Sequence, residues 1–214
     1  MRTRWLPLAL ALGGCAPAAD EAWFSGSIAY HMVAHDAKGK HVPLADSIQT
    51  VYLGAGSFKV LDEQGRLQIL YDGRTNQRRG FTRAGKLLVQ GDTLRPTYRP
   101  LPDTGRVLGY ACRAVQVRGA GNQWVSTVLF APALQVNPVA FRSRATGSTG
   151  ALLQATSGAL PLRITMVSTN KLVQQITLVM EATAVTRRPL TPADFVPDTL
   201  ARPVRATPGD SSRL

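Results

Sequence analysis

The chain has 214 residues, and its 25 basic residues outnumber 13 acidic ones to give a net charge of +12. This length is enough for one domain with a substantial core. Beyond the N-terminus no stretch is long and apolar enough for a transmembrane helix, which needs about 20 residues and is therefore excluded.

The first 14 residues are typical of a secretion signal. Arg2 and Arg4 make a basic start, residues 5–12 are mostly apolar, and Gly13 and Gly14 form a small-residue exit. An apolar stretch of about eight residues is too short to cross a membrane as a helix. We therefore expect an exported protein whose signal peptide covers residues 1–14.

Leu12-Gly13-Gly14-Cys15 resembles the bacterial lipobox, in which a cysteine follows a leucine and two small residues. In lipoproteins that cysteine takes a diacylglycerol through its thiolate, and the amine freed by cleavage is acylated. The resemblance implies that Cys15 is lipidated and that residues 15–22 form a tether to a membrane. An ordinary secretion signal with an incidental cysteine is the alternative.

The second cysteine, Cys112, has no partner once Cys15 carries lipid, so the fold cannot depend on an internal disulfide. It lies in an apolar strand pattern, which predicts a small buried side chain rather than a reactive thiol.

Arginine supplies 20 of the 25 basic residues, and its guanidinium suits phosphate and carboxylate groups. For an exported protein beside a membrane, we expect contact with anionic lipid head groups. Export and the absence of a recognised module argue against nucleic acid as a partner. Because the basic residues are spread along the chain, an ordinary solvated surface is the alternative to a specific anionic site.

From Trp23 onward, short apolar runs alternate with Gly, Asp, Asn and Pro, which indicates β structure. We predict strands over residues 24–34, 48–53, 58–61, 66–71, 75–82, 86–90, 107–118, 123–130, 160–167 and 173–185. Asp72-Gly73 predicts a hairpin turn. Within 107–118 the apolar face shifts along the run, which suggests a bulge.

Helical signals are few. Asn137 and Pro138 predict a short helix reaching about residue 144, and Thr191 with Asp194 predicts one further turn. Loops are expected at 35–46, at the prolines of 96–102, and at 146–159, where a Gly-, Ser-, Thr- and Ala-rich composition suggests mobility. Residues 201–214 are expected to form a disordered tail.

These elements predict a mainly β protein with few short helices, in which residues 23–200 form a single domain. A sheet of this many antiparallel strands must curl, close or pack on something. Trp124, Val128 and Phe130 lie in a strand that is apolar on both sides, so one face should meet the core and the other a second apolar space.

Several segments resemble a family of uncharacterised bacterial envelope proteins. Residues 24–30 (FSGSIAY) resemble its opening strand, Gly109-Tyr110-Ala111-Cys112-Arg113 its Gly-Tyr-x-Cys-Lys/Arg strand, and Trp124 stands where its next strand begins. That family is similar to the outer-membrane lipoprotein carriers and receptors LolA and LolB. The resemblance implies a curved, unclosed antiparallel half-barrel whose concave face binds acyl chains, although this chain shows little of the helix that covers the carriers' cavity.

Catalytic and metal-binding patterns are weak. His31, His35 and His41 lie close together in the sequence, but positions four apart on a strand are roughly 13 Å apart, too far for one metal ion without a bend. Gly147-Ser148-Thr149-Gly150 is the nearest match to a nucleophile elbow, yet Thr146 stands where the first glycine is required. We therefore expect no catalytic residues, no metal and no cofactor.

Together these observations predict a non-enzymatic lipoprotein of the bacterial cell envelope, anchored through Cys15. We expect it at the outer membrane, on either the periplasmic or the surface face. Its ligand would be a lipid or a lipoprotein acyl chain, bound on the concave face by Tyr110, Trp124, Val128 and Phe130. The alternative is an interaction or scaffold subunit of an envelope complex, with a filled core, a protein partner and no ligand.

Overall fold

The computed structural model describes residues 23–54, 56–82, 87–88, 96–119, 124–142, 147–168 and 175–196. The predicted signal peptide (1–14), Cys15 with its tether (15–22) and the predicted tail (201–214) lie outside the described residues. Within them, no helix has the length and apolar character needed to span a membrane.

Strands make up most of the described chain. They are β1 (Gly26–Asp36), β2 (His41–Val42), β3 (Ile48–Gly54), β4 (Ser57–Leu61), β5 (Leu67–Asp72), β6 (Gln77–Phe81), β7 (Leu87–Leu88), β8 (Thr97–Val107), β9 (Tyr110–Arg118), β10 (Trp124–Gln135), β11 (Ala159–Ser168) and β12 (Ile176–Arg187). One α-helix, α1 (Gly147–Ala155), and two short 3₁₀ helices, η2 (Pro138–Phe141) and η4 (Pro192–Phe195), accompany them.

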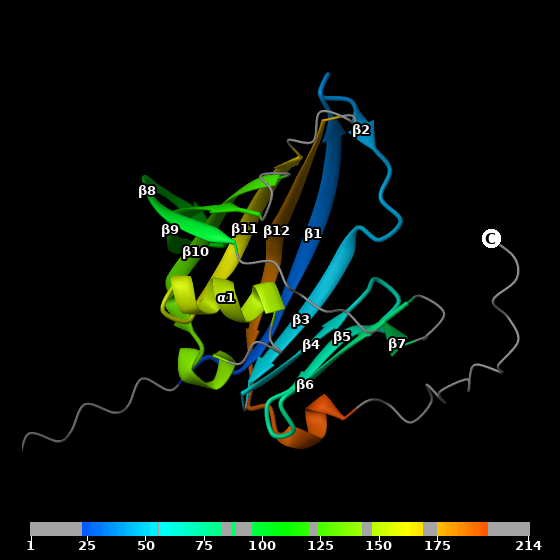
Figure 1. The fold of residues 1–214 in the computed structure, drawn as a ribbon, viewed down its shortest axis with the longest axis vertical. Coiled ribbons are helices and arrows are strands. Elements are labelled where there is room, and N and C mark those ends of the chain that lie inside the picture. The colour runs from blue at the N-terminus through cyan, green and yellow to red at the C-terminus, as the bar shows by residue number, and fades with distance from the viewer. Residues whose placement is uncertain are drawn as a thin grey trace, which may run out of the picture.

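The strands form one antiparallel sheet in the order β7-β6-β5-β4-β3-β1-β12-β11-β10-β9-β8, with β2 beside β1. Its two end strands, β7 and β8, are not neighbours, so the sheet is unclosed, and the predicted mainly β class is confirmed. Figure 1 shows α1 in front of the sheet, between β8–β10 on one side and β3–β6 on the other. We call the face on which α1 packs the inner face.

The inner face holds the main core. Phe58, Tyr71 and Phe141 stack or tilt against one another with ring centroids 5.4–6.3 Å apart, and Leu153 of α1 is buried in the same cluster. On the outer face, Leu190 and Phe195 beside η4 cover Leu70. Two layers of apolar side chains thus hold the sheet from both sides.

The helix α1 corrects the prediction of a mobile loop at 146–159. The segment is rich in small residues and lacks a clear apolar period, so nothing local favours a helix. Its stability comes instead from packing, because Leu153 is buried against the sheet. The Thr156 hydroxyl donates to the carbonyl oxygens of Leu152 and Ala159, at 3.0 and 2.8 Å, and closes the helix end.

The strand β8 corrects the prediction of a loop around the prolines. Pro100 and Pro102 lie within it, yet β8 is an end strand, so their missing N–H groups need not interrupt a second ladder. A register shift between Leu101 and Thr104 absorbs the remaining irregularity.

The predicted strand 107–118 is in fact the end of β8, a tight turn and β9. Val107 pairs with Tyr110, and the turn residues Leu108 and Gly109 have φ angles of 51° and 81°. Positive φ at both central positions is the signature of a type I′ hairpin. The shift in apolar face that suggested a bulge lies within β9, where Cys112 and Val115 are buried on opposite faces of a strand whose pairing with β10 is unshifted.

Three smaller expectations can be compared directly. The helix beginning at Pro138 is confirmed but ends at Phe141, and the turn at Thr191 is confirmed as a capped 3₁₀ helix. The loop predicted at 35–46 is partly wrong, because β1 runs to Asp36 and pairs with β2 through a turn whose amides donate to the Asp36 carboxylate.

Candidate functional site

The inner face of the three strands β1, β12 and β11 carries an apolar patch that is only half buried. We name it the methionine patch, and its members are Met32, Ile164, Met166, Ile176, Leu178 and Met180. Half-buried apolar side chains grouped on one face are a common mark of a binding surface.

Strand register brings these side chains together. Met180 on β12 lies directly opposite Met32 on β1 and Ile164 on β11, and Met166 lies opposite Leu178. Residues two apart on a strand point to the same face, so all of these side chains share the inner face. Directly opposite residues have Cβ atoms about 5 Å apart, which makes the patch continuous.

The helix α1 limits the patch at one end. Leu152 on α1 packs in the same cluster as Ile164, while the far ends of β1, β11 and β12 extend beyond α1 in Figure 1. Below the patch, the buried Tyr30 hydroxyl donates to the Pro161 carbonyl oxygen at 2.7 Å, and burial raises the pKa of this phenol well above its ordinary value. The phenol therefore stays protonated, and its ring and hydroxyl form the buried boundary of the patch on this side.

Trp124 is a predicted ligand-binding residue that lies beside the patch, on the strand next to β11. It is half buried on β10, where it pairs with Ser168, and its neighbour Ser126 pairs with Met166. The indole lies flat on Gly119, where a Cβ atom would come within 2.3 Å of the ring. Any residue other than glycine at position 119 would clash with the indole and force it to move.

The other three predicted residues are placed differently. Val128 is 2% exposed and, with Phe130, packs in the cluster that includes Leu152 of α1. Tyr110 shares a face of β9 with Cys112, opposite to the face that carries Val115. The four residues thus do not line one surface, and Val128 is closed to a ligand because α1, which the sequence did not predict, covers it.

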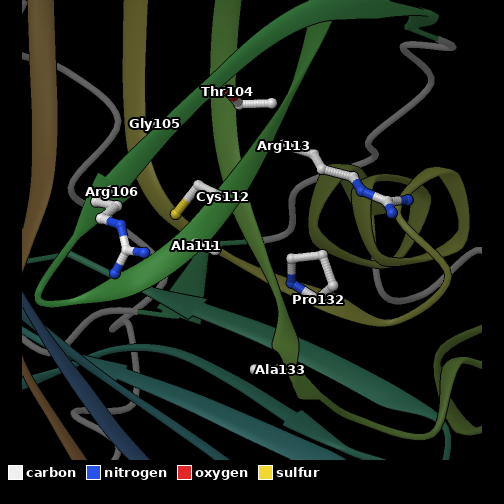
Figure 2. A pocket seen from close by; sticks show the side chains of 8 residues that line it. All are labelled: Thr104, Gly105, Arg106, Ala111, Cys112, Arg113, Pro132 and Ala133. Atoms are coloured by element: carbon white, nitrogen blue, oxygen red, sulfur yellow. The ribbon is translucent and has the colours of Figure 1, made fainter.

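A shallow depression of about 600 Å³ lies where β9 and β10 separate. Pairing of these strands ends at Phe130 and Arg113, and Ala111 and Cys112 then face Pro132 and Ala133 across it. Figure 2 shows Arg106 and Arg113 on opposite sides of Cys112, with their guanidinium groups apart from one another. The two guanidinium groups therefore do not form a joint anion clamp.

Cys112 sits in this depression as a thiol, not as a nucleophile. It is 3% exposed, as predicted, and burial raises the pKa of its Sγ above the ordinary value despite a hydrogen bond from the backbone and the nearby Arg163. A protonated thiol is a poor nucleophile and a poor metal ligand.

The three histidines lie on β1 and β2. His35 and His41 are cross-strand partners with ring centroids 6.1 Å apart, and His31 lies opposite Glu181, which is bound to Arg163. Across the described part of the chain, no group of three or more His, Cys, Asp or Glu side chains could hold a metal ion.

The segment Gly147-Ser148-Thr149-Gly150, which resembles a nucleophile elbow in sequence, forms the first turn of α1. The nearest described element before it is η2, a 3₁₀ helix, whereas a nucleophile elbow joins a strand to a helix. Ser148 therefore lacks the local geometry that exposes a catalytic hydroxyl.

Comparison with known proteins finds likeness only at the level of structure. No family model matches the chain, and no curated protein matches it. It is similar to PNGF-II in two crystal forms, with TM-scores of 0.47 and 0.44 and identities of 14% and 13%, over 78% of this chain. The chain spans 29% and 28% of those two chains.

A LolA superfamily protein from Nitrosomonas europaea, NE2245, is similar with a TM-score of 0.39 and 13% identity. The match covers 81% of this chain and 90% of that one. These likenesses concern the fold alone.

Proposed function

We propose that this protein is a lipid-anchored binding protein of the bacterial envelope, without enzymatic activity, that holds an acyl chain of a lipid or lipoprotein against the methionine patch. The observation that carries the proposal is the patch itself, a continuous apolar surface that the fold leaves half exposed on its inner face.

The chemistry of the patch suits a flexible apolar ligand. Unbranched methionine side chains have three rotatable bonds and a polarisable sulfur, so they adapt to ligands of different shape. Full burial of a Met, Leu or Ile side chain contributes about 1.5–3 kcal/mol, and half-buried ones still have about 1 kcal/mol each to gain. Met32, Met166 and Met180 supply the adaptable part of the surface.

Anchoring at Cys15 is the second half of the proposal. Lipid on Cys15 and the net charge of +10 that remains once Arg2 and Arg4 are removed with the signal peptide would hold the domain near anionic head groups at the outer membrane. Growth with a labelled fatty acid tests this directly. We expect label in the natural protein and none in Cys15→Ser; label in both, or in neither, would refute lipidation at this residue.

Ligand binding is tested by titrating the protein with lysophosphatidylethanolamine, a single-chain phospholipid, below its micellar concentration. We expect saturable binding of one molecule per chain. The double variant Met166→Gln, Leu178→Gln keeps the side-chain volumes nearly constant but makes the patch polar. Losing about 1 kcal/mol at each position should weaken binding at least tenfold.

The matched control changes the outer face of the same strands. Val167 and Val179 are also half buried, and each follows a patch residue in sequence. Val167→Gln, Val179→Gln should bind the lipid as the natural chain does. Equal loss in both double variants, or no binding by the natural chain, would contradict the proposed site. Mass spectrometry of lipids that co-purify from the native membrane identifies the ligand.

The alternative is a scaffold subunit that pairs a partner with an end of the sheet. β8 is an eleven-residue end strand, which favours such pairing. Pro100 and Pro102 work against it, because proline offers no N–H to an added strand. If the chain co-purifies with a protein and carries no lipid, the scaffold function replaces the one proposed above.

A further inference from the structure

Apart from Met1, the chain has three methionines, Met32, Met166 and Met180, and all of them lie in the methionine patch. They come from three different strands and from positions up to 148 residues apart, yet they share one face of the sheet. We propose that these three thioethers form a binding site for a soft monovalent cation, Cu⁺ in the cell and Ag⁺ as its redox-stable substitute.

Strand register supports a common site. Met32 and Met180 are directly opposite partners on β1 and β12, so their Cβ atoms are about 5 Å apart. Met166 is the diagonal neighbour of Met180, because Met180 pairs with Ile164 two positions earlier on β11. Diagonal neighbours are about 7–8 Å apart, within reach of long side chains. Three rotatable bonds let each thioether turn toward a shared ion.

The set of donors selects the ion. Thioether sulfur is a soft, neutral ligand that binds Cu⁺ in preference to hard cations. On the inner face, the residues that neighbour the three methionines along these strands are Tyr30, Ala34, Ile164, Ser168, Leu178 and Ala182, which bring no carboxylate, imidazole or thiol. Zn²⁺, which favours thiolate, imidazole and carboxylate ligands, and Cu²⁺, which favours nitrogen and oxygen donors, therefore find no suitable ligand set here.

The site is open to an ion from outside. All three methionines are partly exposed, although Met180 also packs against the main core, whereas the neighbouring Tyr30, Ala34 and Ala182 are buried. A thioether placed only to fill the core would be buried with its neighbours. This inference goes beyond the acyl-chain function, because it needs the sulfur atoms and not merely an apolar surface.

The test uses the mature chain labelled with ¹³C at the methionine methyl groups and titrated anaerobically with Ag⁺. Cys15 and Cys112 are replaced by alanine, because thiols bind Ag⁺ more tightly than thioethers do. We expect the methyl resonances of Met32, Met166 and Met180 to shift together and to saturate at one equivalent. Shifts at fewer than all three of them, or shifts that do not saturate at one equivalent, would overturn the proposal.

Leucine variants separate this site from the acyl-chain site. Met32→Leu, Met166→Leu and Met180→Leu keep the apolar surface but remove the sulfur. We expect each to weaken Ag⁺ binding at least tenfold and the triple variant to abolish it, because leucine offers no sulfur to the ion. If the triple variant binds Ag⁺ as well as the natural chain, the ion site is disproved whatever happens to lipid binding. Zn²⁺ should leave all three resonances unmoved.

Discussion

Tyr30 on β1 reaches across β12 to donate its hydroxyl hydrogen to the backbone carbonyl of Pro161 on β11, 2.7 Å away. The ring passes over Ala182, its directly opposite partner on β12, and the small alanine side chain leaves enough space for it. One buried side chain thus joins three central strands whose residues lie up to 152 positions apart in the sequence.

Removing that hydroxyl should destabilise the protein. In Tyr30→Phe the ring still packs, but the partly buried Pro161 carbonyl loses its donor, which costs about 1–2 kcal/mol. Urea denaturation followed by tryptophan fluorescence measures the loss. An unchanged midpoint would mean that water or another group satisfies the carbonyl equally well.

The same tyrosine makes stability depend on alkaline pH. Burial raises the pKa of the Tyr30 phenol in the folded state. Its contribution to the free energy of unfolding is therefore fully present below the unfolded pKa of 10.0, and it is lost as the pH rises from there through the folded pKa. We expect the free energy of unfolding to fall more steeply above pH 10 in the natural protein than in Tyr30→Phe. If the free energy of unfolding fell equally steeply with pH in both proteins, Tyr30 would not be the source of the alkaline pH dependence.

Asp62 should govern stability at acid pH. Burial by itself raises its pKa, but hydrogen bonds from the Arg66 amide and guanidinium, Gln68 and Gln64 outweigh burial and hold the pKa below 3.8. Because the folded pKa is lowered, this stabilisation is present above pH 3.8 and is lost as the pH falls through the folded value. Asp62→Asn should lower the free energy of unfolding by about 1–3 kcal/mol at pH 7. It should also make the free energy of unfolding, measured by urea denaturation, depend less on pH below about pH 4.

Asp36 offers a matched control for that substitution. Its carboxylate accepts from the amides of Lys38 and Lys40, as Asp62 accepts from Gln64 and Arg66, but at an exposed turn. An asparagine oxygen can accept the same two bonds, so Asp36→Asn should change the free energy of unfolding by less than about 0.5 kcal/mol. Equal losses in the two variants would show that burial of Asp62 does not matter.

Leu153 should anchor α1 in the core. It is 1% exposed and packs in the main inner cluster, so Leu153→Ala should cost about 2–5 kcal/mol. Val139, on the neighbouring η2, is 56% exposed, and Val139→Ala should be nearly neutral. Thermal unfolding of both variants measures the difference, and a neutral Leu153→Ala would mean that α1 is not docked.

Leu108 is a site where stability can be gained. Its φ of 51° at the tip of the β8–β9 hairpin is unfavourable for leucine, and 46% of the residue is exposed. Asparagine tolerates this conformation in type I′ turns, so Leu108→Asn should add about 0.5–1 kcal/mol and raise the Tm by about 2–4 °C. A lower Tm would reveal a contact that the leucine makes.

Most strands could be predicted because alternation and turn residues are local signals. Asp72-Gly73 correctly marks the β5–β6 hairpin, and the alternation from Leu160 to Met166 correctly marks β11. The helix α1 was missed because its stability lies in contacts of Leu153 with distant strands. The hairpin at Leu108-Gly109 was missed because leucine is unusual in such a turn.

The candidate site was harder to predict, because it depends on which strands become neighbours. Trp124, Val128 and Phe130 were singled out as a local apolar run, and they do cluster. The pairing of Met32 with Met180 joins segments 148 residues apart, and no local pattern specifies it. The sequence could show only that the methionines fall in predicted strands, and strand register is what brings them together as a patch.

The pairing of β1 with β12 also bears on when the protein can fold. The first long strand, β1, lies between β3 and β12, and β12 is the last strand in the described part of the chain. That central pair cannot form until nearly all of the polypeptide has been synthesised, and such distant pairing is intrinsically slow. A polypeptide that cannot complete its sheet early stays unfolded longer, which is the state that a secretion channel threads.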